Sequence, residues 1–263
     1  MSFLFLSLQL LPPTAVFYTT ACFLSLVFEQ VKRPQTHPTT LTPQHSDTGL
    51  GLTWRPPTAG TADDLLATTR ADKLVRLSRR TLTPIASTQW PNQVNAPTFS
   101  NSGQNVLLPA SNGTLAILAY PSLTVQKVLP AHPSAVTAAV QDPRGRHIAT
   151  GGGDSLVALW SSADFTCKVT YPNLLTGPVR SVSFSFDGAY LVAGDEGGGA
   201  GFEGLSVVHV EDGEEVCRIP CAPDGRRGVG EVAWHPGRYW VAFAGGREGE
   251  GGLKVAGVGG GLL

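Results

Sequence analysis

Six histidines occur in this 263-residue sequence, and His132 is the one to consider first for chemistry, because an imidazole can act as a catalytic base or bind a metal ion. The sequence around it supports neither role. No Cys and His pair has the spacing of a zinc site, and neither a G-x-S-x-G elbow nor an H-E-x-x-H motif occurs. The acidic pairs at 63–64 and 214–215 lie in turn contexts, where solvated carboxylates are the ordinary case. We therefore expect no enzymatic activity, no metal, no cofactor and no small-molecule substrate.

Three glycine-rich stretches, 151–153, 197–201 and 245–252, have the composition of phosphate-binding loops. None is followed by Lys-Ser or Lys-Thr, and none joins a strand to a convincing helix, which excludes the P-loop and dinucleotide-binding motifs. We expect flexible hairpin loops instead. Cys217 and Cys221 flank Arg-Ile-Pro in a strand-like run, and we expect them to be buried thiols rather than a metal-binding pair.

The elements that carry His132 are strands. Residues 130–160 read PAHPSAVTAAVQDPRGRHIATGGGDSLVALW, in which three short apolar runs are separated by the turn at 142–145 and by the glycines at 151–153. A fourth run, 165–170, follows after four more residues. Short strands separated by turn residues predict an antiparallel meander rather than a helix, as in one blade of a β-propeller.

The same pattern recurs along the chain. Each unit has a landmark residue at the end of its first strand, and neighbouring landmarks are separated by about 40–50 residues, close to the period of a propeller. They are Trp54, Phe99, Gln141, Phe184 and Trp234. We therefore predict an all-β propeller with about five four-stranded blades over residues 45–257. Residues 1–44, an apolar segment and a linker rich in Pro and Thr, and the glycine-rich tail 258–263 are predicted to lie outside it.

These repeats resemble WD repeats. In that family an Asp in the turn before the third strand holds a His, the His bonds a Ser or Thr on the second strand, and this hydroxyl meets the indole N–H of a Trp on the third. The resemblance implies a structural hydrogen-bond tetrad in the central unit, formed by His132, Thr150, Asp154 and Trp160. In an earlier unit it implies a partial tetrad that lacks the Trp, formed by His45, Thr68 and Asp72.

Four longer sequence segments resemble the third subunit of the THO complex more specifically than WD repeats in general, and this resemblance covers about residues 45–257. They are NGTLAILAYPSL (112–123), AHPSAVTAAVQDPRGRHIATGGGDSLVALW (131–160), PVRSVSFSFDG (178–188) and VAWHPGRYWVAFA (232–244). The glycine expansions are similar to those of the fungal branch of that family. The resemblance implies a non-catalytic nuclear scaffold of the THO/TREX machinery, which couples transcription to mRNA processing and nuclear export. Its partners would be other THO subunits, with mRNA reached indirectly through the complex.

Two alternatives stay open beside this resemblance. The first concerns the ring: the family leads us to expect seven blades and its first repeat is missing here, so either the chain is incomplete at its N-terminus or the ring is open. An open ring exposes strand edges that invite pairing with another chain. The second concerns function: a generic WD-repeat adaptor of another nuclear or cytoplasmic complex would carry the same repeats.

Residues 1–28 are apolar and uncharged, which raises the question of a membrane segment or a signal peptide. Pro12-Pro13 divides the stretch into pieces shorter than the roughly 20 residues that span a bilayer, and no basic residue precedes it. We therefore expect no membrane association, and the resemblance to the THO subunit implies a nuclear protein. A secreted or membrane-anchored propeller is the alternative if residues 1–28 act as a signal or anchor, and only then does the glycosylation sequon Asn112-Gly113-Thr114 matter. The net charge of −1 gives no positive field for direct RNA contact.

Overall fold

The computed structural model describes residues 85–197, 204–221, 228–244 and 253–257 with their side chains, together with residues 51, 53, 55 and 56. In the rest of the chain it describes only the backbone of the strands given below. Two of the predicted site residues, His45 and Asp72, lie outside the described residues, as does the tail 258–263.

The described residues form twenty-two strands in six antiparallel sheets. The first sheets contain β1 (Ala15–Thr20), β2 (Phe23–Phe28) and β3 (Thr39–Thr40), then β4 (Gly49–Trp54), β5 (Asp64–Thr69), β6 (Lys73–Ser78) and β7 (Pro84–Gln89). The next contain β8 (Thr98–Phe99), β9 (Asn105–Pro109), β10 (Thr114–Ala119) and β11 (Thr124–Pro130), then β12 (Val136–Gln141), β13 (His147–Gly152), β14 (Val157–Ser161) and β15 (Cys167–Tyr171). The last contain β16 (Val179–Phe184), β17 (Tyr190–Asp195), β18 (Gly204–His209) and β19 (Glu215–Pro220), then β20 (Val229–Trp234), β21 (Trp240–Gly245) and β22 (Gly252–Gly257).

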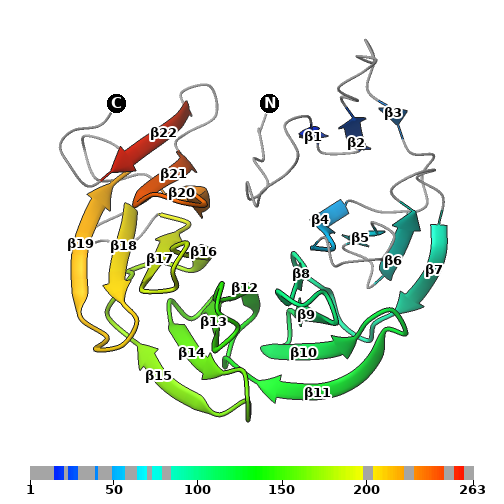
Figure 1. Ribbon diagram of the computed structural model, residues 1–263, viewed down its shortest axis with the longest axis horizontal. Helices are drawn as coiled ribbons and strands as arrows, with labels where there is room; N and C mark the ends of the chain where they lie inside the picture. The colour runs from blue at the N-terminus through cyan, green and yellow to red at the C-terminus, as the bar shows by residue number, and fades with distance from the viewer. Residues whose placement is uncertain are drawn as a thin grey trace.

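Figure 1 shows the five sheets from β4 to β22 following one another round an arc, each with its first strand inside and its last strand outside. We call each of these sheets a blade. The inner strands of neighbouring blades are in contact: β8 with β12, β12 with β16, and β16 with β20. The predicted all-β fold built from antiparallel meanders is confirmed. The open or incomplete ring stays a prediction.

The blades repeat one another in register as well as in strand order. In four of them a β-bulge interrupts the pairing of the first two strands, at Gly49/Gly51, Val136/Ala138, Val179/Ser181 and Val229/Glu231. A bulge re-aims the strand locally and is a feature that repeated units preserve. All five landmark residues of the sequence are the last residues of inner strands: Trp54 of β4, Phe99 of β8, Gln141 of β12, Phe184 of β16 and Trp234 of β20.

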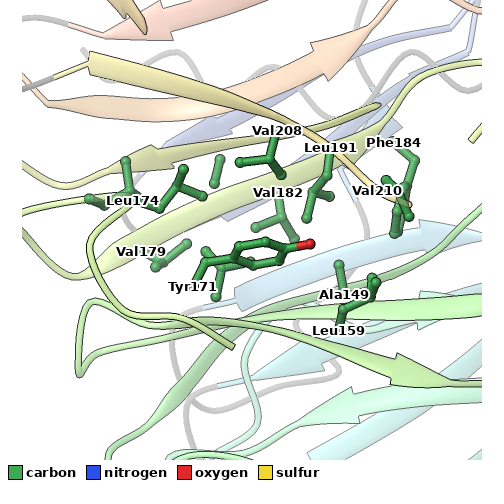
Figure 2. Packing of buried hydrophobic residues seen from close by; sticks show 13 residues of the cluster. Ala149, Leu159, Tyr171, Leu174, Val179, Val182, Phe184, Leu191, Val208 and Val210 are labelled. Atoms are coloured by element: carbon green, nitrogen blue, oxygen red, sulfur yellow. The ribbon is translucent and has the colours of Figure 1, made fainter. Parts of the chain in front are cut away.

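The hydrophobic core lies between the blades. Strand β14 is buried at all five of its positions, because both faces of its sheet meet a neighbouring blade. One face contributes Leu159, which packs with Leu191 and Val208 of the following blade (Figure 2). The other face contributes Trp160, which packs with Leu107 and Ile117 of the preceding blade. Each inter-blade contact therefore uses side chains from two sheets, and no blade buries its apolar residues alone.

Residues 1–44 include the three strands of a separate sheet, β1-β2-β3. Their placement outside the propeller was predicted from composition and stays a prediction, because the side chains of this segment lie outside the described residues. Within the part of the chain that the structure describes, no helix is long and apolar enough to cross a bilayer.

Candidate functional site: a buried hydrogen-bond tetrad

The structure brings four polar side chains of the central blade together in a continuous chain of hydrogen bonds. The His132 Nδ1 lies 3.1 Å from both carboxylate oxygens of Asp154, and its Nε2 lies 2.9 Å from the Thr150 Oγ1. The Trp160 Nε1–H donates to the same hydroxyl oxygen over 3.0 Å. The four residues come from the loop before β12, from β13, from the β13–β14 turn and from β14.

The donors and acceptors of this tetrad run in one direction. An indole N–H can only donate and a carboxylate can only accept, so the two ends of the chain are fixed. With a neutral imidazole, Trp160 donates to Thr150, the hydroxyl of Thr150 donates to the His132 Nε2, and the His132 Nδ1–H donates to Asp154. Asp154 Oδ1 also accepts the backbone N–H of Leu156 over 3.1 Å, which fixes the turn that carries it. Each polar group in the tetrad thus has a partner.

The tetrad is buried, which decides what it can do chemically. Thr150 has no exposed surface and the His132 side chain is 1% exposed. The order carboxylate, imidazole, hydroxyl is that of a hydrolase triad, but a nucleophile must reach a substrate carbonyl. The Thr150 oxygen is enclosed and already bonded on two sides. These residues therefore cannot act on a substrate, and the arrangement serves as an internal brace.

The three glycines at 151–153 are explained by close packing rather than by phosphate binding. A Cβ at Gly152 would overlap with the Asp154 Oδ1 and the His132 Nδ1. A Cβ at Gly151 would overlap with Val179 of the next blade, and one at Gly153 would lie 2.8 Å from the Ser134 hydroxyl. Glycine is needed where another group approaches the backbone this closely. The other glycine-rich stretches, around 197–201 and 245–252, lie largely outside the described residues.

A contact between blades holds the loop that carries His132. The backbone N–H groups of Ala131 and His132 both donate to the Gly113 carbonyl over 3.0 Å. Gly113 occupies the β9–β10 turn with a φ of 84°, in the left-handed region that glycine accepts readily. A side chain at Gly113 would overlap with the His132 carbonyl. The tetrad therefore braces the joint between the second and third blades as well as the sheet of the third.

The neighbouring blades have apolar side chains at the positions of Thr150 and Trp160. By strand register Ala193 and Val208 occupy the positions of Thr150 and Trp160 in the following blade. In the preceding blade the corresponding residues are Leu108 and Leu118. All four are buried. At these two positions the neighbouring blades therefore use hydrophobic packing. The following blade holds its entry loop by other buried polar contacts: the Ser206 hydroxyl donates to the Leu174 carbonyl over 2.9 Å, and Asp195 accepts the Gly177 N–H over 3.3 Å.

The predicted partial tetrad has less support. Thr68 lies in β5, where it pairs with Gly51 and Leu74. This register places Thr68 level with Gly151 of the central blade rather than with Thr150. The side chain of Thr68 lies outside the described residues, like His45 and Asp72, so the partial tetrad stays a prediction.

The prediction that Cys217 and Cys221 are both buried is confirmed for Cys221 and wrong for Cys217. Cys221 is buried, and its thiol donates to the Gly228 carbonyl over 3.4 Å. Cys217 is exposed, because it lies on the outer strand β19, whose side chains meet no further sheet. Its thiol is nevertheless partly shielded from solvent, which raises the pKa of Cys217, and the nearby charge of Glu215 raises that pKa further. No group of three His, Cys, Asp or Glu residues that could hold a metal is present in the described part of the chain.

Two further features were not foreseen from the sequence. Glu231 on the inner strand β20 is partly buried and accepts a hydrogen bond from the Ser181 hydroxyl of the preceding blade over 3.1 Å. Burial raises the pKa of this carboxyl to about 7. In the turns that follow β16 and β20, the rings of Phe186 and Tyr239 are in contact, tilted by 46° with centroids 5.0 Å apart, although both residues are partly exposed. The only signal in the sequence was the aromatic richness of the segment around Trp234 and Tyr239.

Comparison with known proteins agrees with the repeat architecture. Residues 123–161 and 162–199 match the model of the WD domain, G-beta repeat. The first match begins just before β11 and ends with β14, so one sequence repeat takes its outer strand from one blade and its three inner strands from the next. The loop that carries His132 lies inside this repeat, at the step between the two blades.

Two relatives match a longer part of the chain. THO complex subunit 3 of Arabidopsis thaliana is 32% identical over 176 residues, which make up 67% of this chain and 53% of that protein. WD repeat-containing protein AAC3 of Dictyostelium discoideum is 29% identical over 186 residues, 68% of this chain and 37% of that protein. The chain thus spans about half the length of the first relative and less of the second. It is a WD40 repeat protein, distantly similar to THO complex subunit 3 over part of its length.

Proposed function

We propose that this protein is a non-catalytic scaffold subunit of a nuclear THO-type complex, which couples transcription to mRNA processing and export. The observation that carries the proposal is the 32% identity to THO complex subunit 3 over 176 residues. The proposed partners are the other subunits of such a complex. The protein would reach mRNA indirectly, because its net charge of −1 provides no excess of cations for phosphate contacts.

The geometry supports a scaffold rather than an enzyme. The carboxylate, imidazole and hydroxyl that could form a catalytic triad are used inside the protein: His132, Asp154 and Thr150 bond one another within the central blade. A rigid array of blades exposes its turns and outer strands, and a scaffold binds its partners through such surfaces. The exposed outer strands β11, β15 and β19 and the turns at both ends of the blades provide surface of this kind.

A WD-repeat adaptor of a different complex is the second candidate. The identity of 29% to WD repeat-containing protein AAC3 favours it, since it is of similar extent along the chain. Purification of the tagged full-length protein from its source organism distinguishes the two. We expect THO subunits to be recovered in amounts comparable to the bait. Recovery of another assembly, such as a ubiquitin ligase or a membrane complex, in place of THO subunits would refute the proposal.

The third candidate is a secreted or membrane-anchored propeller. Asn112 of the sequon accepts hydrogen bonds from the Thr114 backbone N–H over 3.2 Å and from the Thr114 hydroxyl over 2.7 Å, so the Asn-Gly turn has a structural reason of its own. We expect the protein in the nuclear fraction, with no change in its mobility after treatment with a glycosidase. A shift that the substitution Asn112→Gln abolishes would establish the secretory route instead.

A further inference from the structure

The arc carries an exposed surface that the hydrogen-bond tetrad does not explain. It is formed by the turns that join the first and second strands of three consecutive blades. These turns are neighbours: Gly188 of one lies against Asp142 and Pro143 of the blade before it. The Tyr239 hydroxyl of the blade after it donates to the Asp187 Oδ2 over 2.8 Å. We call the set Arg144, Phe186, Arg238 and Tyr239 the aromatic–arginine surface.

The two aromatic rings of this surface are exposed but held rigidly. Phe186 is 38% and Tyr239 37% exposed, and their centroids are 5.0 Å apart. Beneath them Tyr190 packs edge-on against Tyr239 at 5.5 Å, and Trp234 does the same at 6.4 Å. A fixed aromatic pair loses little conformational entropy when a partner covers it, and such residues are typical anchors of protein interfaces.

The charges at this surface that remain open to a partner are arginines. Asp142 has no exposed surface and accepts the backbone N–H groups of Arg146 and His147. Asp187 accepts hydrogen bonds from Ser185, Ala189 and Tyr239. Although burial acts to raise its pKa, these bonds hold the pKa of Asp187 below its usual value. Both carboxylates are therefore engaged within the turns.

Two exposed arginines lie in the turns of this surface, Arg144 in the β12–β13 turn and Arg238 in the β20–β21 turn. Arg144 lies close enough to affect Tyr239: the Asp187 hydrogen bond raises the pKa of the Tyr239 phenol, and the Arg144 charge acts against it. Arg238 stacks over Trp240 with its guanidinium carbon 4.8 Å from the ring centroid. The outer turn between β18 and β19 is acidic, since it contains Glu211, Asp212 and Glu214. Positive charge thus lies with the inner turns and negative charge with the outer turn.

We infer that the aromatic–arginine surface binds an acidic segment of a partner protein. A large apolar side chain of that segment packs on Phe186 and Tyr239, and its carboxylates face Arg144 and Arg238. Complementary charge of this kind selects and orients a partner. A nucleic acid is disfavoured, because the phosphates of its backbone would find few cations along this protein. The identity of the partner rests on the proposed function, under which the segment belongs to another THO-type subunit.

Photo-cross-linking in the source organism tests this inference with the full-length tagged protein. A photoreactive phenylalanine analogue replaces Phe186 in one strain and Val216, an exposed residue of the outer strand β19, in the control strain. Cross-linked peptides are identified by mass spectrometry. We expect adducts at position 186 with a protein segment rich in Asp and Glu, at a yield at least tenfold above that at position 216.

A charge reversal sharpens the test. Arg144→Glu should reduce the yield of the adduct at position 186 by about tenfold, whereas Lys127→Glu, the same change on the exposed strand β11, should leave it unchanged. Both changes are on exposed side chains, so the melting temperature should stay at the wild-type value. Adducts with RNA or with basic segments, no excess over position 216, or equal effects of the two reversals would each overturn the inference.

The outcomes separate this inference from the proposed function. An acidic segment from a protein outside any THO-type complex would support the surface and refute the proposed function. Co-purification of THO subunits without an adduct at position 186 would overturn the surface and leave the proposed function supported.

Discussion

The substitution Thr150→Val tests whether the tetrad braces the fold. Valine matches threonine in shape but removes the hydroxyl that joins His132 and Trp160. It leaves the His132 Nε2 and the Trp160 Nε1–H without this partner in a region from which water is excluded. A buried polar group left unsatisfied costs about 1–3 kcal/mol, so we expect the free energy of unfolding to fall by about 2–4 kcal/mol. For a chain of this size the melting temperature should fall by roughly 4–16 °C.

A matched control lies in the same row of the same blade. Thr150 pairs with Ala158 on β14, and Ala158 pairs in turn with Thr170 on the outer strand β15, where the side chain is exposed. Thr170→Val should change the free energy of unfolding by less than about 0.5 kcal/mol, as surface substitutions usually do. Thermal and urea unfolding of the two variants and the wild type provide the measurement. Equal effects of the two substitutions would refute the brace.

A double-mutant cycle isolates the bond itself. Trp160→Phe removes the indole N–H and keeps an aromatic ring, so the combination with Thr150→Val should cost less than the sum of the single changes by about 1–2 kcal/mol. Contacting residues in one hydrogen-bond network are expected to be coupled in this way. Strict additivity would mean that the two side chains contribute independently, by packing alone.

Three further predictions follow from the packing. Trp160→Ala removes a buried indole and should destabilise by about 3–5 kcal/mol, measured by urea unfolding. Gly152→Ala places a methyl group on Asp154 and should cost about 1–3 kcal/mol, whereas Gly237→Ala, which meets nothing within 4 Å, should be nearly neutral. Because the pKa of Glu231 is raised from 4.5 to about 7, its protonated form stabilises the fold below pH 4.5 and that stability is lost as the pH rises through 7. Glu231→Gln should therefore be more stable than wild type by about 2–3 kcal/mol at pH 8 but not at pH 4, in melting curves at both values.

The sequence predicted the blades well because their signals are local. The turn at 142–145 and the alternation around it identify two strands and their connection without reference to any distant residue. The landmark residues then fixed the period, and all five end inner strands in the structure. Even Gln141, which is not aromatic, occupies its expected place, since the turn that follows it has the same pattern as its counterparts.

What the sequence did not predict depends on contacts between blades. Glu231 and Ser181 are fifty residues apart, and their hydrogen bond exists only because β16 and β20 lie side by side. The ring contact between Phe186 and Tyr239 likewise joins turns of two blades. Cys217 and Cys221 look alike in a strand-like run, but one faces solvent from an outer strand and the other lies beside Gly228. The alternation of apolar and polar residues along a strand predicts which side chains share one face of its sheet. The exposure of a side chain in this fold depends also on whether its strand is an inner or an outer strand of the blade.

The contrast between the central blade and its neighbours bears on what a buried polar tetrad contributes. Leu108 and Leu118 on one side, and Ala193 and Val208 on the other, hold the same backbone geometry with apolar contacts. A hydrogen bond between these two positions is therefore not required for a blade to form, and the following blade holds its entry loop through Asp195 and Ser206 instead. The distinct contribution of the tetrad is directional: hydrogen bonds specify one arrangement of the His132 loop, whereas apolar side chains tolerate several. That loop bonds to Gly113 in the blade before it, so its position sets how two blades meet. Loss of the tetrad should consequently loosen the joint between the second and third blades before it unfolds either sheet, and amide hydrogen exchange at Ala131 and His132 should accelerate more in Thr150→Val than exchange within β13.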